Sequence, residues 1–79
     1  MAVHFLKTWP EYFTEVKEGR KKFEVRENDR NFQIGDKLVL QEFDPKNGYT
    51  EDVVEKEVTY IFHGGKFGVS EGTVIMGIE

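Results

Sequence analysis

The chain contains no cysteine, so it can form no disulfide and offers no thiolate to a metal. It has two prolines and no repeat or low-complexity run, so nothing divides its 79 residues, and we expect a single domain over residues 1–79. No apolar run is long enough to span a membrane, and no signal peptide is evident. These absences favour a cytoplasmic protein that does not contact a membrane.

Positive charge is also scarce, because 11 Lys and Arg residues stand against 15 Asp and Glu residues, for a net charge of −4. This balance argues against double-stranded DNA as a partner, since non-specific duplex binding needs many cations that neutralise phosphates. The two histidines are far apart, and neither has other ligands nearby. We therefore expect neither a metal nor another cofactor, and we expect His4 to be a core or rim residue with satisfied polar atoms.

The cations that are present cluster in one segment. Residues 17–30 hold six of the 11 basic side chains and have a net charge of +2, whereas the rest of the chain has a net charge of −6. A basic strip on an acidic domain is a candidate site for an anionic ligand. The alternative is a solvated surface whose ion pairs contribute little.

One helix is predicted over Thr8–Glu18. Its first residue and Glu11 fit a capping box, in which each side chain bonds the backbone of the other. Trp9, Phe13 and Val16 then recur at helical spacing on one face. We expect Trp9 and Phe13 to pack in the core, although Trp9 could instead stack on a base.

After the helix the pattern has a period of two, which is typical of a strand. Phe23 and Val25 are predicted to point into the core, and Glu24 and Arg26 to line a surface cleft. Further strands are predicted at 3–7, 37–43, about 53–62 and 73–78, with a hairpin turn at 44–48. Val58 and Tyr60 in the long strand are expected on the same face.

Five or six strands and one helix in so short a chain do not suit a parallel sheet, because each parallel crossover needs a dozen or so residues. The fold class is therefore mainly β (α+β). We expect a small, mostly antiparallel barrel with the helix near its opening, since closure of a sheet removes its exposed edges.

The residues that could carry binding lie in and around the basic strip. An arginine fork can grip a phosphate or a base edge, asparagine can read base edges, and tryptophan can stack on a base. Ion pairing, turn formation and core packing are the structural alternatives. The candidate ligand-binding set is Lys7, Trp9, Lys21, Lys22, Glu24, Arg26, Asn28, Asp29 and Arg30.

The run Gly19–Arg26, followed by Gly35-Asp36-Lys37-Leu38, resembles the ASCH domain of the PUA-like superfamily, which carries G-x-K-x-x-E-x-R and then G-D at the start of a strand. Residues 4–13 and 26–30 also resemble a compact bacterial and phage-associated subfamily, so the resemblance covers nearly the whole chain. It implies a small PUA-like β-barrel of five or six strands that binds RNA or a modified nucleotide in a cleft beside the helix. The family's Lys, Glu and Arg fall on Lys21, Glu24 and Arg26.

One bacterial ASCH branch that the chain resembles hydrolyses an acetylated cytidine nucleoside, using that Lys, a Thr three residues later and a Glu near the C-terminal part. Here Glu24 occupies the Thr position, and Glu71 is the only acidic residue in the segment before the last strand. We therefore favour a module that binds RNA or a nucleoside or nucleotide. The alternatives are a small hydrolase with Lys21 and Glu24 as catalytic residues, and a protein interaction module without a ligand pocket.

We expect Arg26→Ala to weaken binding with little effect on stability. A Lys21 ammonium within hydrogen-bond reach of a carboxylate would favour the enzyme. An open basic groove with exposed aromatic rings would favour RNA binding, and a filled opening with a flat apolar patch would favour the interaction module.

Overall fold

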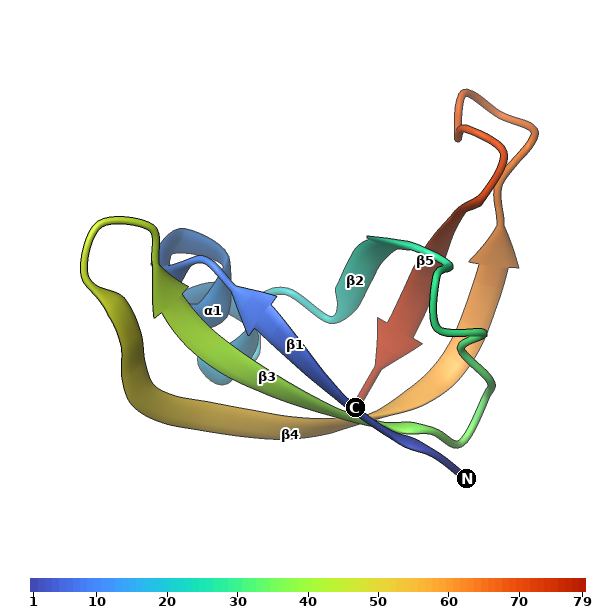
Figure 1. The fold of residues 1–79 in the computed structure, drawn as a ribbon. Helices are drawn as coiled ribbons and strands as arrows, with labels where there is room; N and C mark the ends of the chain where they lie inside the picture. Colours follow the sequence, from blue (N-terminus) through green and yellow to red (C-terminus); the bar gives the residue numbers. More distant parts are fainter.

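The computed structural model describes residues 1–79 and is mainly β, with one helix, as predicted (Figure 1). The elements in chain order are β1 (Val3–Thr8), α1 (Pro10–Lys17), β2 (Phe23–Glu27), β3 (Lys37–Asp44), β4 (Gly48–His63) and β5 (Thr73–Ile78). The helix, of eight residues, is too short to cross a membrane.

The five strands form one mixed sheet in the order β1-β3-β4-β5-β2. Three of the four strand pairs are antiparallel, as the sequence predicts. The parallel pair is β1 with β3, and the connection between them contains α1 and β2. Strand β4 is long and curved, so that its first half pairs with β3 and its second half with β5 (Figure 1).

The sheet is not closed into a barrel, so the predicted closure is wrong. Strands β1 and β2 stand at its two ends, and their backbones are not paired with each other. The gap between these two edges is bridged by one side chain from β2, because Arg26 donates to the backbone carbonyl of Lys7 in β1. A long polar side chain thus lies where a closed barrel would have backbone hydrogen bonds.

The apolar core lies between the curved sheet and α1, which packs against β3. Exposed and buried residues alternate along β1, and half-buried and buried residues alternate along β5, so one face of each strand contributes to the core. The core residues are Leu6, Phe13, Val16, Phe32, Leu38, Leu40, Val58, Val74, Met76 and Ile78.

The helix begins later than predicted, and the capping box is wrong. Thr8 is the last residue of β1, and its hydroxyl donates to the Leu6 carbonyl and accepts from Arg26, so it does not cap the helix. The N-cap residue is Trp9, which makes no side-chain cap. Phe13 is buried as expected, but Trp9 is 51% exposed and so does not belong to the core.

Glu24 and Arg26 of β2 line a cleft, as predicted, but the expectation that Phe23 and Val25 lie in the core is wrong. Phe23 and Val25 are 45% and 52% exposed, whereas Glu24 is 2% exposed and Arg26 is half-buried. Charged side chains can face inward only where they satisfy one another, and here Arg26 and Glu24 are hydrogen-bonded. Phe23 and Val25 instead lie on the outer face of the sheet, where Val25 pairs with Ile75 of β5.

The second half of β4 is also displaced from the predicted alternation. A bulge between Val58 and Tyr60 shifts the register against β5. Val58 is therefore buried while Tyr60 is exposed, and Ile61 packs against the core instead. The expectation that Val58 and Tyr60 share a face is wrong for this reason.

Hydrogen bonds to Asp36 connect the start of the chain with the loop before β3. Its carboxylate accepts hydrogen bonds from the Ala2 N–H at 3.0 Å, the His4 ring at 2.8 Å and the Gln33 N–H at 2.9 Å. Burial acts to raise the pKa of Asp36, but these hydrogen bonds outweigh it and lower the pKa from 3.8 to about 2. His4 is thus the buried, satisfied histidine that was predicted.

Candidate ligand-binding cleft

A cleft of about 460 Å³ opens at the gap between the two sheet edges. Its walls come from the end of β1, the start of α1 and the segment that enters and forms β2. The lining residues are Lys7, Thr8, Trp9, Tyr12, Lys21, Phe23, Glu24, Val25 and Arg26.

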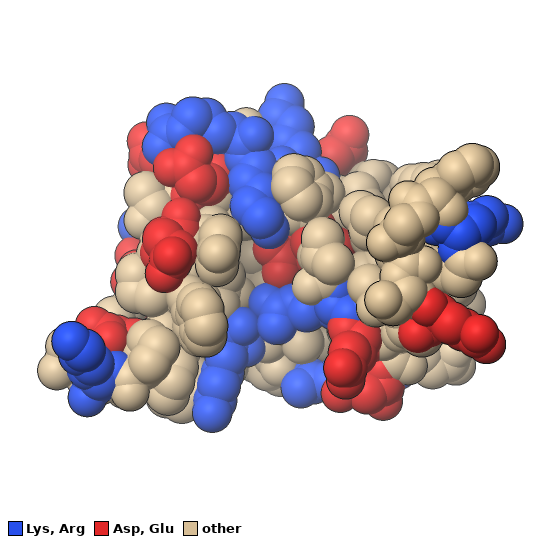
Figure 2. All heavy atoms as spheres, turned by 90° about the horizontal axis from the view of Figure 1, so that it is seen from above, with Lys and Arg blue, Asp and Glu red and all other residues tan.

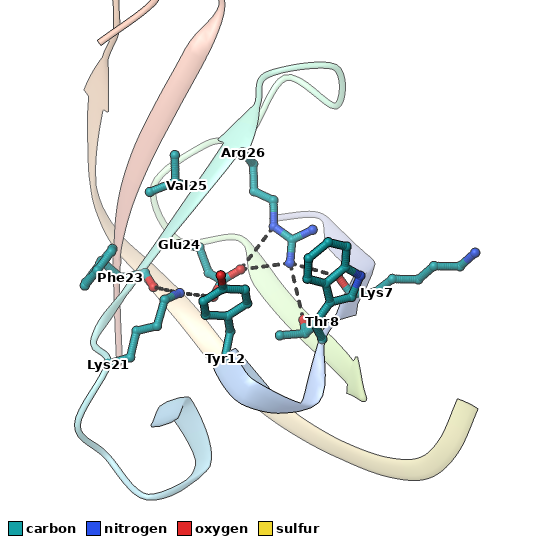
Figure 3. Close-up of a pocket in the computed structure, with 9 residues that line it drawn as sticks. Lys7, Thr8, Tyr12, Lys21, Phe23, Glu24, Val25 and Arg26 are labelled. Carbon is teal, nitrogen blue, oxygen red and sulfur yellow. Dashed lines mark hydrogen bonds and ion pairs between the residues drawn. The ribbon is translucent and has the colours of Figure 1, made fainter. Parts of the chain in front are cut away.

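Glu24 lies at the centre of this cleft, and both of its carboxylate oxygens are occupied (Figure 3). Oε1 accepts from Arg26 Nε at 3.0 Å and from Nη2 at 2.9 Å. Oε2 accepts from Lys21 Nζ at 2.8 Å. A buried carboxylate thus holds two cations, one on each side, and the three groups together carry a net charge of +1.

Arg26 donates hydrogen bonds to three residues, and one of its two NH₂ groups has no partner. Its Nη2 also donates to the carbonyl oxygen of Lys7 at 3.1 Å and to Thr8 Oγ1 at 3.3 Å. Its Nη1 has no partner within the protein. The guanidinium plane is therefore fixed by β1 and Glu24 while one NH₂ group stays available.

Lys21 is held in a similar way. Its ammonium donates to the Phe23 carbonyl at 2.7 Å as well as to Glu24, and it lies 4.7 Å from the centre of the Phe23 ring. An ammonium has three N–H donors, so one remains beyond these two hydrogen bonds. The Lys21 side chain is 19% exposed, so this donor lies at a partly desolvated position.

Aromatic rings form the apolar part of the lining. Trp9 and Tyr12 stack on each other, with ring centres 6.3 Å apart and planes inclined by 22°. Tyr12 is 48% exposed, close to the value for Trp9, so both rings retain open surface. Rings in this state can stack on a planar ligand.

Charges of both signs meet on this face of the molecule. Figure 2 shows basic side chains on two sides of a small acidic area near the middle of the face that is turned upward in Figure 1. The arrangement agrees with the cation–carboxylate–cation contacts of the cleft.

Several predicted residues do not join this site through their side chains. The Lys7 side chain extends away from Glu24 (Figure 3), and its ammonium lies 4.5 Å from the centre of the Phe43 ring. Lys22 is exposed and outside the lining. The Asn28 side chain accepts from the Phe32 N–H, which stabilises the loop after β2.

Asp29 and Arg30 also lie outside the cleft lining. Asp29 is an exposed loop residue, 4.0 Å from Arg30 in a loose ion pair. Arg30 Nη1 donates to the Phe5 carbonyl at 2.9 Å, so it covers the same open edge of β1 that Arg26 contacts. Its contact therefore protects a sheet edge.

The structure adds Thr8, Tyr12, Phe23 and Val25 to the predicted site residues. Thr8 could not be identified as a site residue from the sequence, because the capping-box pattern assigned its hydroxyl to the helix. Val25 could not be identified either, because an apolar strand residue is normally assigned to the core.

The profile of a protein family described as a domain of unknown function, DUF3850, matches residues 3–78. The chain belongs to the DUF3850 family. A similar protein from Escherichia phage P2 is named "Uncharacterized 12.9 kDa protein in GpA 3'region". It is 39% identical over 57 residues, which cover 72% of this chain and 51% of the relative. This DUF3850 chain thus matches about half the length of its phage relative.

Proposed function

We propose that this DUF3850 domain is a cytoplasmic module that binds RNA or a nucleotide-like ligand in the cleft between β1, α1 and β2. The observation that carries the proposal is Glu24, a buried carboxylate that fixes Lys21 and Arg26 beside exposed aromatic rings. On the run Gly19–Arg26 we also propose kinship with the ASCH domains.

The chemistry of the cleft suits such a ligand for two reasons. Exposed aromatic rings bind unstacked bases through their faces, with about 1–3 kcal/mol for each base. Fixed cations attract phosphate and base oxygens, and their local charge is positive although the whole chain is acidic. A cleft of about 460 Å³ admits a base but not a duplex.

Intrinsic fluorescence provides a direct test, because the single tryptophan of the chain lines the cleft. Titration with mononucleotides and short single-stranded RNAs should change the Trp9 emission until it saturates. Tyr12→Ala should weaken this binding, whereas Tyr60→Ala should not, because Tyr60 is also exposed but lies outside the cleft. Failure of every RNA and nucleotide to bind would refute the proposal.

A second candidate is the hydrolysis of an acetylated cytidine, which the Lys21–Glu24 contact of 2.8 Å favours. Although the Thr position of the hydrolase branch is Glu24, the hydroxyl of Thr8 also lines the cleft. In this reaction water adds to the acetyl carbonyl, the C–N bond breaks, and acetate and cytidine leave. Release of cytidine that disappears in Lys21→Ala would establish it. An interaction module without a pocket is less well supported, because the cleft is open.

A further inference from the structure

Two arginines contact the open edge of β1, one inside the cleft and one beyond it. Arg26 Nη2 donates to the Lys7 carbonyl at 3.1 Å, and Arg30 Nη1 donates to the Phe5 carbonyl at 2.9 Å. The other edge of β1 pairs with β3, so both carbonyls point away from the sheet. Arg30 does not line the cleft, and the cations therefore continue past the cleft along this edge.

The spacing of the two contacts follows from strand geometry. Phe5 and Lys7 are two residues apart in β1, so their carbonyls point to the same side and lie about 6.6 Å apart along the strand. Neighbouring phosphates of an extended single strand are separated by a comparable distance. The phosphates of a diphosphate share an oxygen atom and lie closer together. The spacing therefore favours the phosphates of successive nucleotides.

Both arginines keep donors for a ligand. Arg26 Nη1 and Arg30 Nη2 have no partner within the protein. The carboxylate of Asp29 lies 4.0 Å from Arg30 Nε, too far for a hydrogen bond. Each guanidinium is thus fixed by a hydrogen bond to β1 and still carries N–H groups, which bind phosphate oxygens well because the contact is charge-assisted.

The order of these groups along β1 leads into the cleft. From the start of the strand, the contact of Arg30 comes first and that of Arg26 second, and the strand ends just before Trp9, whose exposed ring lines the cleft. Proteins that bind single strands combine cations that follow the backbone with aromatic rings on which bases stack. The open edge of β1 and the cleft together have this arrangement.

From these contacts we infer that the cleft holds one nucleotide of a longer RNA single strand, whose backbone follows the open edge of β1 while Arg26 and Arg30 hold successive phosphates. The inference rests on the proposed function, and it selects an RNA chain over a free nucleotide as the ligand. Because phosphate contacts carry no sequence information, binding should depend on the length of the RNA and on salt far more than on its bases.

A series of uridine ligands tests the inference, with binding followed through the Trp9 emission. Tetrauridine should bind about tenfold or more tightly than uridine monophosphate, because it reaches Arg30 as well as the cleft. Tetrauridine with neutral methylphosphonate linkages should lose this gain, and that comparison uses the unmodified protein. Uridine diphosphate should not reproduce the gain, because its two phosphates are too close together to reach both arginines.

Variants assign the gain to the edge of β1. Arg30→Met should bring the affinity for tetrauridine down toward that for the monophosphate, and should reduce the slope of log affinity against log salt by about 0.7, the value for one phosphate contact of a single strand. Arg20→Met is the matched control, because Arg20 pairs with Glu15 and lies outside the cleft. The control should keep the full gain with length.

The outcomes separate this inference from the proposed function. Equal affinities for uridine monophosphate and tetrauridine would overturn the backbone path and leave nucleotide binding in the cleft intact. Failure of every ligand to bind would overturn both. Uridine diphosphate that binds as tightly as tetrauridine, or a gain with length that persists in folded Arg30→Met protein, would contradict the assignment of successive phosphates to Arg26 and Arg30.

Discussion

The guanidinium of Arg26 donates a hydrogen bond to the backbone carbonyl of Lys7, and this contact of 3.1 Å joins the two unpaired ends of the sheet. Arg26 belongs to β2 and Lys7 to β1, and neither strand pairs with the other. The same guanidinium neutralises the buried Glu24. One side chain therefore serves both the fold and the candidate site.

Arg26→Met should destabilise the protein by about 2–4 kcal/mol, because it leaves Glu24 buried with only one cation. Urea unfolding measures this loss. On these contacts we expect Arg26 to matter for stability as well as for binding.

Arg30→Met is the matched control for this prediction. Arg30 also donates to a β1 carbonyl, that of Phe5, but it does not contact Glu24. The Arg30→Met substitution should therefore lower the free energy of unfolding clearly less than Arg26→Met does. Equal losses in the two variants would assign the effect of Arg26 to the sheet edge and not to the buried charge.

The strand positions could largely be predicted from the sequence because they depend on local signals. Strand β5 has the predicted bounds, Thr73–Ile78, since its alternation is regular and a glycine precedes it. The turn at Asp44–Gly48 likewise follows from turn residues between two apolar segments.

The faces of β2 could not be predicted in this way. Alternation separates Phe23 and Val25 from Glu24 and Arg26, but it does not say which pair faces inward. The usual rule places apolar residues inside. Here it fails because Lys21 and Arg26, both close in sequence to Glu24, satisfy its charge inside the cleft, and only the tertiary structure shows that pairing.

The candidate site was predictable in part for the same reason. The clustering of cations identifies Lys21 and Arg26 as candidates, because the contacts between them and Glu24 span only a few residues. Asn28 carries the same polar chemistry in sequence, yet its side chain stabilises a loop. Thr8 enters the site from another strand, and no local pattern indicates that approach.

Acid should weaken the fold through Asp36. Its folded pKa is lowered, so the carboxylate contributes stability at pH values above the unfolded value of 3.8, and this contribution is lost as the pH falls toward about 2. Unfolding by urea at a series of pH values should show the decrease, and Asp36→Asn should be less stable near neutral pH and show a smaller decrease across that window. An identical acid profile in the two proteins would exclude Asp36 as its source.

Glu24→Gln should change stability and anion binding in opposite directions. The substitution removes the negative charge between Lys21 and Arg26, so the net charge of the group rises by one unit and the two cations repel each other without compensation. Unfolding should become easier, while the affinity for simple phosphates should rise and become more dependent on salt. Loss of phosphate affinity in a folded Glu24→Gln protein would show that the carboxylate contacts the ligand directly.

Gly64→Ala should disrupt the connection between β4 and β5. A Cβ atom at this position would lie 2.0 Å from the Ser70 carbonyl oxygen and 2.7 Å from that of Thr73, so the backbone has to move to admit even one methyl group. The Gly64 N–H also donates to the Thr73 carbonyl at 2.8 Å, a bond that this movement would break. We expect the free energy of unfolding to fall by about 2 kcal/mol or more, which for a domain of this size lowers the melting temperature by roughly 8 °C or more.

Gly68→Asn is the control for this prediction, because Gly68 has φ +79° with open space around it, and asparagine tolerates this conformation better than other residues. Melting temperatures measured by circular dichroism should therefore fall much further for Gly64→Ala than for Gly68→Asn, and the reverse order would show that the close approach at Gly64 does not constrain the loop.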